Sequence, residues 1–196
     1  MTKEKIFEIA IALIKSEGIK GITTRKIADL AGTNVASVNY HFGSKDKLIN
    51  EVLKRHLASF HVTFNLLDDT EVPPLERLKK FLLAYSSLLL AHPELAKSLL
   101  SQEQLFESHN QFMEFMKSQG IEKLIRTVSE IVGLTDQERI MPIIIQMFAA
   151  IFFPTVIKSN ANPTLTAAMI KTEQSIEQQV DLFLEFYFYK FRGKES

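Results

Sequence analysis

The chain has 196 residues, a length that suits one large domain or a small domain joined to a larger one. Hydrophobic residues make up 46% of it, which is enough to form a sizeable core, and the formal net charge at pH 7 is zero. A chain without net charge does not have the overall basic character of a nucleic-acid binder. The absence of cysteine excludes disulfides, thiolate catalysis and Cys-ligated metal sites, and it fits a cytoplasmic location.

The charge is distributed unevenly along the chain. Residues 1–56 contain ten Lys or Arg and six Asp or Glu, a net of +4, whereas residues 57–196 contain thirteen and seventeen, a net of −4. The N-terminal part is therefore the basic part. No apolar run reaches the length of a membrane span, and Glu4 and Glu8 interrupt the first apolar pattern, so we expect neither a membrane partner nor a secretory signal.

Helical periodicity runs along the whole sequence, while strand signals are scarce. In the N-terminal part, the pattern predicts helices over about residues 2–16, 24–31, 35–41 and 44–67, with Thr23 or Thr24 and Ser44 as N-caps. Further along it predicts helices over about 75–91, 93–100, 107–132, 135–158 (capped by Thr135 and containing Pro142) and 164–191. Nine helices and no strand predict an all-α protein.

The second and third helices form a helix-turn-helix candidate, because a Gly-containing turn joins two short helices. Ile27, Leu30 and Ala31 of the second helix are expected to pack inward with Val38 and Phe42 of the third. In such a motif the third helix of the chain would lie in the major groove of DNA, with its first residues facing base edges.

Polar side chains are dense on the predicted outer face of this motif. Asn34 offers a bidentate contact to adenine, Ser37 offers a hydroxyl to several bases, and Val35 offers an apolar contact to a thymine methyl. Thr24, at a helix N-terminus, suits a phosphate, and Lys45 suits the flanking backbone. The pattern alone leaves another interpretation open, because short helix pairs with a Gly turn are common in all-α proteins and Tyr40 and His41 could be buried.

Two segments carry a resemblance to a known family. "TTRKIADLAG" resembles the second helix of the tetracycline-repressor (TetR) family of bacterial regulators, and "NYHFGSKDKLI" resembles the end of its recognition helix and the start of its fourth helix. The match covers about residues 3–55. It implies a nine-helix TetR-like architecture, with a three-helix DNA-binding domain over residues 1–46 and a helical ligand-binding and dimerisation domain over residues 47–196.

The resemblance also implies a function. Members of this family are ligand-responsive transcriptional regulators, so we expect a homodimeric repressor that leaves a palindromic double-stranded operator when a small apolar effector binds. It assigns Thr24 and Arg25 to phosphate contacts and often a base contact. It assigns base edges to Val35, Ala36, Ser37 and Asn39, and phosphates to Tyr40, His41 and Lys45. The residues expected to contact DNA are Thr24, Arg25, Asn34, Val35, Ala36, Ser37, Asn39, Tyr40, His41 and Lys45. Asn39 stands where many members have Tyr, which leaves open whether it reads an adenine or only caps or braces the helix. Thr33 stands where a small apolar residue is usual.

One helix-turn-helix makes few contacts, so such modules usually pair across a two-fold axis with recognition helices about 34–36 Å apart. The resemblance implies a homodimer formed by the last two long helices of each subunit as a four-helix bundle. The positions expected to pair are Ile143, Met147, Ile151 and Phe152 on one helix and Phe183, Phe186 and Tyr187 on the other. The same apolar stripes would also serve the subunit's own core, and both roles remain open.

Aromatic residues are concentrated in the C-terminal part. The chain has 15 Phe, of which only Phe7 and Phe42 precede residue 57. Aromatic and Met side chains suit an apolar ligand, although at helical spacing they are more often core, so the pocket depends mainly on the resemblance. The expected ligand-binding residues are Phe60, Phe64, Phe81, Tyr85, Phe106, Phe112, Phe115, Met116, Met147 and Phe148.

Catalysis and metal binding are not expected. The sequence shows no Ser–His–Asp set and no Gly-rich phosphate loop, and His61, His92 and His109 are not spaced as metal ligands. We therefore predict no cofactor, no metal and no enzymatic activity. A carrier of small molecules is a second alternative, but a carrier would not need Arg25 and Lys45 beside a helix-turn-helix.

Overall fold

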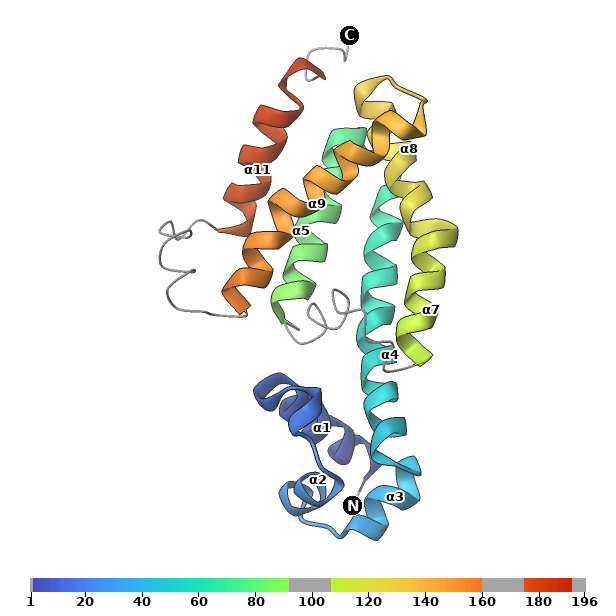
Figure 1. Cartoon of the computed structure of the whole chain (residues 1–196), viewed down its shortest axis with the longest axis vertical. Coiled ribbons are helices and arrows are strands. Elements are labelled where there is room, and N and C mark those ends of the chain that lie inside the picture. The colour runs from blue at the N-terminus through green and yellow to red at the C-terminus, as the bar shows by residue number, and fades with distance from the viewer. Residues whose placement is uncertain (1, 92–106, 160–174, 192–196) are drawn as a thin grey trace. The chain divides into compact units, whose positions relative to one another are not determined.

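The computed structural model describes residues 2–91, 107–159 and 175–191, and within these ranges every regular element is helical (Figure 1). The all-α prediction is therefore confirmed for the described part of the chain. Contacts divide this part into two compact units. The first unit contains residues 2–59 and 107–113, and the second contains residues 60–91, 114–159 and 175–191.

The first unit contains α1 (Lys3–Glu17), α2 (Thr24–Ala31), α3 (Val35–Phe42) and most of α4 (Lys45–Phe64). The core of this unit is formed by the apolar side chains that the helices share, which include Ile6, Ala10, Ile22, Ile27, Val38, Phe42, Leu48 and Val52. Arg55 of α4 lies over the ring of Phe7 at 4.0 Å and donates to Glu4 at 3.1 Å, which fastens α4 to α1. α2 and α3 are thus packed against the same hydrophobic core as α1 and α4.

The predicted burial of Leu30 is wrong, because this side chain is 58% exposed. The buried stripe of α2 consists of Ile27, Ala28 and Ala31. At about 100° per residue, Leu30 lies roughly 105° from the centre of that stripe and therefore faces solvent. Two of the three buried side chains are alanines. Because these side chains are small, the buried stripe of α2 is narrow and the helix can lie close to its neighbours.

The second unit contains η2 (Asn65–Leu67), α5 (Pro74–Ala91), α8 (Ile121–Val132), α9 (Gln137–Ser159) and α11 (Ile176–Tyr187). α5 packs against α8, α9 and α11, so it is the central helix of this unit. α4 and α7 (Glu107–Phe115) each contribute residues to both units. The predicted functional boundary between residues 46 and 47 lies near the start of α4, and it stays a prediction.

The helix expected over residues 107–132 is divided by a π-helical turn at Met116–Gly120, which separates α7 from α8. The reason is visible in the spacing of the inward positions, since Phe112, Met116, Gly120 and Leu124 are each four residues apart. A regular α-helix rotates about 40° at every such step, whereas a wider turn keeps all of them on one side. Gly120 is buried, and a Cβ atom there would lie 2.9 Å from the Met116 Sδ and 3.3 Å from the Phe64 ring.

The last helix also differs from its prediction. Ser175 has an extended backbone, and α11 begins at Ile176 with a capping box in which Ser175 Oγ accepts from the Gln178 N–H at 3.1 Å and Gln178 Oε1 accepts from the Ser175 N–H at 2.9 Å. A continuous helix over 164–191 is therefore wrong at Ser175. The helix predicted over residues 93–100 and the segment 164–174 lie outside the described residues.

The start of α9 is capped by a different residue from the one predicted. Asp136 Oδ1 accepts a hydrogen bond from the Glu138 N–H at 3.0 Å, so Asp136, rather than Thr135, satisfies the first turn of α9. Asp is as good an N-cap as Thr, and the two residues are adjacent. Pro142 lies within α9, as the sequence predicts.

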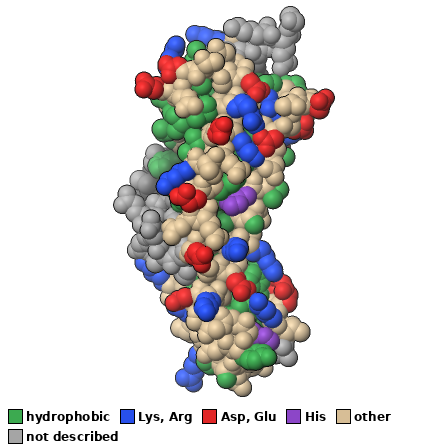
Figure 2. All heavy atoms as spheres, turned by 90° about the vertical axis from the view of Figure 1, so that its right-hand side faces the viewer, with side chains coloured by type: hydrophobic (Ala, Val, Ile, Leu, Met, Phe, Trp, Pro, Cys, Tyr) green, Lys and Arg blue, Asp and Glu red, His purple; other side chains and the backbone are tan. Residues whose placement is uncertain are grey.

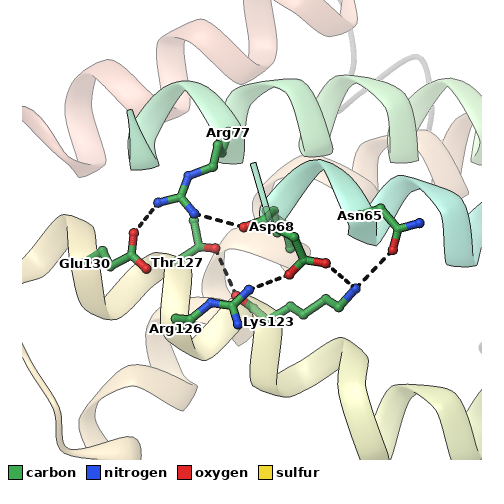
Figure 3. Close-up of polar contacts among 8 residues, drawn as sticks. Asn65, Asp68, Arg77, Lys123, Arg126, Thr127 and Glu130 are labelled. Atoms are coloured by element: carbon green, nitrogen blue, oxygen red, sulfur yellow. Dashed lines mark hydrogen bonds and ion pairs between the residues drawn. The ribbon is translucent and has the colours of Figure 1, made fainter. Parts of the chain in front are cut away.

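A network of charged groups holds the chain at the end of α4 against α5 and α8 (Figure 3). Arg77 of α5 is buried, donates to the carbonyl of Leu67 at 3.0 Å and forms an ion pair with Glu130 of α8. The Asp68 carboxylate forms ion pairs with two residues of α8, with Lys123 Nζ at 2.6 Å and with Arg126 Nη2 at 2.5 Å. The Leu67 carbonyl that Arg77 contacts is at the C-terminal end of a helical turn, where the partial charge of the backbone is negative and favours a cation.

Burial of its carboxylate opposes ionisation of Asp68, but the hydrogen bonds and charges of Lys123 and Arg126 outweigh this effect and lower its pKa. Lys123 additionally donates to Asn65 Oδ1 at 3.1 Å, so one ammonium group contacts two residues of the segment that follows α4 (Figure 3). The ionised form of Asp68 is therefore the form that the folded second unit favours.

Candidate nucleic-acid interface

The first element of the candidate interface is the N-terminus of α2. Thr23 is the N-cap, and its Oγ1 accepts from the Lys26 N–H at 3.2 Å. Thr24 and Arg25 are consequently the first two helical residues, whose backbone N–H groups have no partner within the helix. Arg25 is exposed and Thr24 is partly exposed. This arrangement presents two N–H groups, a hydroxyl and a guanidinium together.

The turn between α2 and α3 is a Schellman motif. Gly32 has φ 68° and ψ 39°, its N–H donates to the Asp29 carbonyl at 3.1 Å, and the Thr33 N–H donates to the Ala28 carbonyl at 2.9 Å. A left-handed conformation of this kind suits Gly, which has no Cβ. Thr33 therefore contributes through its backbone, and its departure from the family pattern leaves the turn intact.

Asn34 starts α3 as its N-cap. Its Oδ1 accepts from the Ser37 N–H at 2.8 Å, which satisfies one of the free amides of the first turn. A bidentate contact to adenine needs both the carbonyl oxygen and the amide group of Asn. Because the oxygen of Asn34 is already engaged, its structural role is capping. An Asn immediately before a helix is a recognised capping signal, so the sequence contained this information.

The faces of α3 are clearly divided. Val38 and Phe42 are buried, while Tyr40, on the opposite side, is 84% exposed. Val35, Ala36 and Asn39 are exposed beside Tyr40, and Ser37 and His41 are partly exposed on the other flank. The alternative that Tyr40 is a core residue is therefore wrong. The His41 ring packs edge-on against the Tyr40 ring, with centroids 5.3 Å apart.

The C-terminal side of α3 leads directly into α4. The Gly43 N–H donates to the Asn39 carbonyl at 2.7 Å, and Ser44 Oγ accepts from the Lys47 N–H at 3.2 Å, as the predicted cap requires. Lys45 and Lys47 occupy the first turn of α4, close in sequence to the end of α3. All ten sequence-predicted DNA-contacting residues therefore lie on α2, α3, the turn between them or the start of α4.

The basic residues of the first unit fall into two groups. Lys26 pairs with Glu17 at 2.5 Å and Lys3 pairs with Glu51 at 3.4 Å, so these charges are largely compensated. Arg25, Lys45 and Lys47 form no ion pair with any described residue. Figure 2 shows acidic and basic side chains interleaved on the face that it draws. Lys5, Lys15 and Lys54 also form no ion pair with a described residue, so Arg25, Lys45 and Lys47 are distinguished by their position beside α3 in the sequence.

The predicted ligand-binding residues of the second unit come together around Tyr85. The centroid of its ring lies 4.9 Å from that of Phe60, 5.4 Å from Phe81 and 5.9 Å from both Phe64 and Phe148. Burial raises the pKa of Tyr85, so the phenol is neutral. Sequence reasoning did not assign Phe152 to this cluster, although its ring lies 5.0 Å from Tyr85.

The other members of the predicted ligand set are distributed differently. Phe115 stacks on His61 at 4.1 Å and meets Phe64 at 5.3 Å, while Met116 lies in the π turn and Met147 is buried. Phe112 belongs to the first unit, and Phe106 lies outside the described residues. The ligand-binding role of the whole set stays a prediction.

The outer faces of α9 and α11 carry large apolar side chains. The exposed ones on these two helices are Ile145, Phe153, Leu182 and Phe186, and Tyr189 follows α11. Tyr187 Oη donates to Gln146 Oε1 at 2.5 Å, which joins the two helices. Met147, Ile151 and Phe152 are buried in the subunit itself, so these predicted pairing positions serve its own core.

Membrane spans and metal clusters are both absent from the described ranges. No described helix combines the length and the apolar character that crossing a bilayer would require. Among the same residues, no three His, Cys, Asp or Glu side chains gather as a metal site would need.

Comparison with known proteins gives matches to the N-terminal part and to the fold. Residues 6–52 match the model of the bacterial regulatory proteins of the tetR family. The HTH-type transcriptional repressor KstR2 of Mycobacterium tuberculosis (strain CDC 1551 / Oshkosh) is 32% identical over 80 residues, which cover 41% of this chain and 40% of that repressor. The HTH-type transcriptional repressor NicS of Pseudomonas putida is 29% identical over 123 residues, which cover 63% of this chain and 56% of that repressor. The matched part thus spans less than two thirds of either curated relative.

Solved structures extend the similarity over nearly the whole chain. PfmR of Thermus thermophilus, a TetR family transcriptional regulator, has a TM-score of 0.65 at 15% identity and covers 97% of this chain and 99% of its own. A TetR transcriptional regulator from Legionella pneumophila has a TM-score of 0.61 at 19% identity, covering 93% and 96%. At such identities the likeness shows the fold alone. Residues 6–52 thus match the tetR family of bacterial regulatory proteins, and the fold of the chain is similar to that of solved TetR-family regulators.

Proposed function

We propose that this protein is a DNA-binding transcriptional regulator, a homodimeric repressor that a small apolar effector releases from its operator. The observation that carries this proposal is the outer stripe of α3. Val35, Ala36, Asn39 and Tyr40 face solvent on a helix whose other side is core, and this helix follows a tight Gly turn. A structural helix of this size gains nothing from an 84% exposed Tyr, whereas a recognition helix needs such a face.

The charges near α3 support contacts to the phosphate backbone. Arg25, Lys45 and Lys47 are uncompensated among the described residues, and Arg25 and Lys45 each lie in the first turn of a helix. A helix N-terminus and a cation together favour a phosphate. These contacts would position α3 in the groove without reading sequence, and the side chains of α3 would supply the specificity.

The apolar faces of α9 and α11 support pairing with a second copy. Ile145 and Phe153 on one helix and Leu182 and Phe186 on the other are large apolar side chains that are exposed in the single subunit, and exposed apolar surface of this kind favours a protein–protein contact. A two-fold pair places two recognition helices about 34–36 Å apart, which is one turn of DNA. The operator is then a palindrome, and the protein acts in the cytoplasm, where a bacterial chromosome lies.

The aromatic cluster around Tyr85 supports an uncharged effector. Its rings are apolar, burial raises the pKa of Tyr85, and burial also lowers the pKa of His61 beside Phe115, so both groups favour their neutral forms. An effector that binds one arrangement of the dimer better than another shifts the population, and the change in DNA affinity is limited by that preference. α4 contains both Lys45 and the cluster residues Phe60 and Phe64, so it is the segment that would carry the change.

A mobility-shift titration with the region upstream of the gene tests the proposal. We expect a shifted complex at low salt, and a steep linear fall of log K with log salt concentration, because bound phosphates release counterions. Ala at Lys80, an exposed residue of α5, provides the control. The absence of a complex on upstream DNA and on random duplex pools would refute the proposal and favour a carrier of small molecules.

A further inference from the structure

The composition of α3 limits which bases it can read, and this inference rests on the proposed function. The helix consists of Val35, Ala36, Ser37, Val38, Asn39, Tyr40, His41 and Phe42. It contains no Arg and no Lys, the residues that make the commonest specific contact to guanine through O6 and N7. It also contains no Asp or Glu to accept from the cytosine amino group. Direct reading of G·C pairs therefore has little support from α3.

The side chains at the start of α3 complement thymine. Val35 and Ala36 are the first two residues of the helix, and both are exposed. The first residues of a recognition helix face base edges, and these two offer only methyl groups there. An apolar side chain in the major groove matches the C5-methyl group of thymine, and no other base in unmodified DNA carries a methyl at that edge.

Asn39 complements adenine. It lies one helical turn after Val35, on the same side as Ala36, and its side chain is exposed. No described residue accepts a hydrogen bond from the side-chain amide N–H of Asn39 or donates one to its side-chain oxygen Oδ1, so both side-chain groups are available to adenine N6 and N7. Asn34 differs, because its Oδ1 already holds the Ser37 N–H. Of the two Asn residues, Asn39 is the one equipped for bidentate reading.

We propose that α3 reads its half-site as A·T base pairs, with Val35 and Ala36 contacting thymine methyl groups and Asn39 contacting an adenine. The substrate class is thus a duplex whose bases beneath the first turns of α3 are A·T pairs. Tyr40 and Lys45, further along, hold the phosphates, and Arg25 on α2 lies outside this set.

Thymidine replaced by deoxyuridine tests the thymine contacts, since the pair keeps its hydrogen bonds and loses only the methyl group. The full-length protein first selects its site from random duplex DNA, and each thymidine of that site is then replaced singly. We expect one or two positions in each half-site to bind about three- to fivefold more weakly, as loss of one buried methyl-sized group predicts. Replacement outside the half-sites should have no effect.

Protein variants connect each effect to its side chain. Val35→Ser should bind the parent site more weakly and should lose its response to deoxyuridine at one position, as a double-mutant cycle between contacting groups requires. Val62→Ser, at an exposed Val of α4, should keep the full response. Asn39→Ala should reduce the preference for adenine at one position by roughly 5- to 150-fold.

The results that would overturn the inference are specific. A selected half-site dominated by G·C positions, a site indifferent to deoxyuridine at every thymine, or an unchanged base preference in Asn39→Ala would each contradict it while leaving DNA binding established. Failure to select any DNA would instead refute the proposed function itself.

Discussion

The side-chain oxygen of Asn34 accepts a hydrogen bond from the backbone N–H of Ser37 at 2.8 Å, and this contact fixes where α3 begins. Every exposed side chain of α3 is oriented relative to that first turn. Asn34, which the sequence predicted to contact a base, is therefore the N-cap that sets the orientation of the exposed side chains of α3.

Two substitutions of Asn34 distinguish the effect of the N-cap on stability from the effect of a negative charge on DNA binding. Asn34→Ala should lower the free energy of unfolding by about 0.5–2 kcal/mol, because the Ser37 N–H loses its partner. Asn34→Asp should retain the stability, since Asp caps equally well. It should still weaken DNA binding, because a carboxylate would lie near phosphates. Urea unfolding and mobility shifts measure the two effects, and equal DNA affinity of Asn34→Asp and the parent would contradict the proposed location of DNA.

Lys45 and Tyr40 are expected to act on the phosphate backbone. Lys45→Ala should weaken binding to all sequences similarly and should reduce the slope of log K against log salt concentration by about 1 per subunit. Tyr40→Ala should weaken binding without changing base preference. Lys80→Ala in α5 is the matched control for loss of one exposed Lys. An unchanged salt slope in Lys45→Ala would remove this residue from the interface.

The outer face of α11 is expected to form the dimer. Phe186 is 69% exposed, and a Glu there would place an uncompensated charge in the proposed subunit interface. Phe186→Glu should therefore sediment as a monomer in analytical ultracentrifugation and bind operator DNA much more weakly. Val62→Glu replaces a similarly exposed apolar residue of α4, at 64%, and should remain a dimer. A dimeric Phe186→Glu would exclude this face.

Asp68 gives the second unit a defined response to acid. Its pKa is lowered from the usual 3.8 in the folded state, so in the pH range between the lowered pKa and about 3.8 the folded protein binds fewer protons than the unfolded chain. The stabilisation from Lys123 and Arg126 is thus present above about pH 4 and is lost as the pH falls through the lowered pKa. Asp68→Asn should lack this component of the acid response.

Unfolding by urea at pH 7 and pH 3 measures that component. Asp68→Asn should be destabilised at pH 7, and its difference in stability from the parent should be smaller at pH 3. Lys123→Met should remove part of the same component, and the double variant should show less than additive loss, because both residues belong to one network. An equal difference between Asp68→Asn and the parent at both pH values would show that the network does not cause the effect.

The π turn is expected to tolerate the loss of one residue. A π turn corresponds to one extra residue in an α-helix, and Gln119 is an exposed member of it. Deletion of Gln119 should leave Phe112 and Leu124 facing inward and should change the free energy of unfolding by no more than about 1 kcal/mol. Deletion of Lys80 from the regular helix α5 should rotate one part of the helix by about 100° and unfold the second unit. Equal damage from both deletions would contradict the π geometry.

Much of the first unit could be predicted from local sequence. Capping by Thr23 and Ser44, the Gly32 turn and the burial of Val38 and Phe42 all depend on residues within one or two helical turns of each other. Interactions over such short separations are readable from order and spacing alone. This is why the fold class and the helix-turn-helix were correct, while the base-reading role of individual side chains remains a prediction.

In the second unit, the local sequence did not predict which faces of the long helices are buried. Helical spacing identified the apolar stripes of α9 and α11, but it did not determine which of their faces is covered by α5 and which is exposed. Met147 and Phe152 face the core, whereas Phe153 and Phe186 face outward. A one-residue difference in position turns a side chain by about 100°, and only contacts with neighbouring helices select the rotation.

The order and spacing of residues were enough to predict an all-α chain with a basic N-terminal helix-turn-helix, because helix periodicity, caps and turns are set by neighbours along the chain. The tertiary structure alone decided the exposure of Leu30, the π turn at Met116–Gly120, the gathering of aromatic rings around Tyr85 and the charge network at Asp68. The aromatic cluster and the charge network join residues tens of positions apart, and their energies depend on which helices meet, which no local pattern encodes.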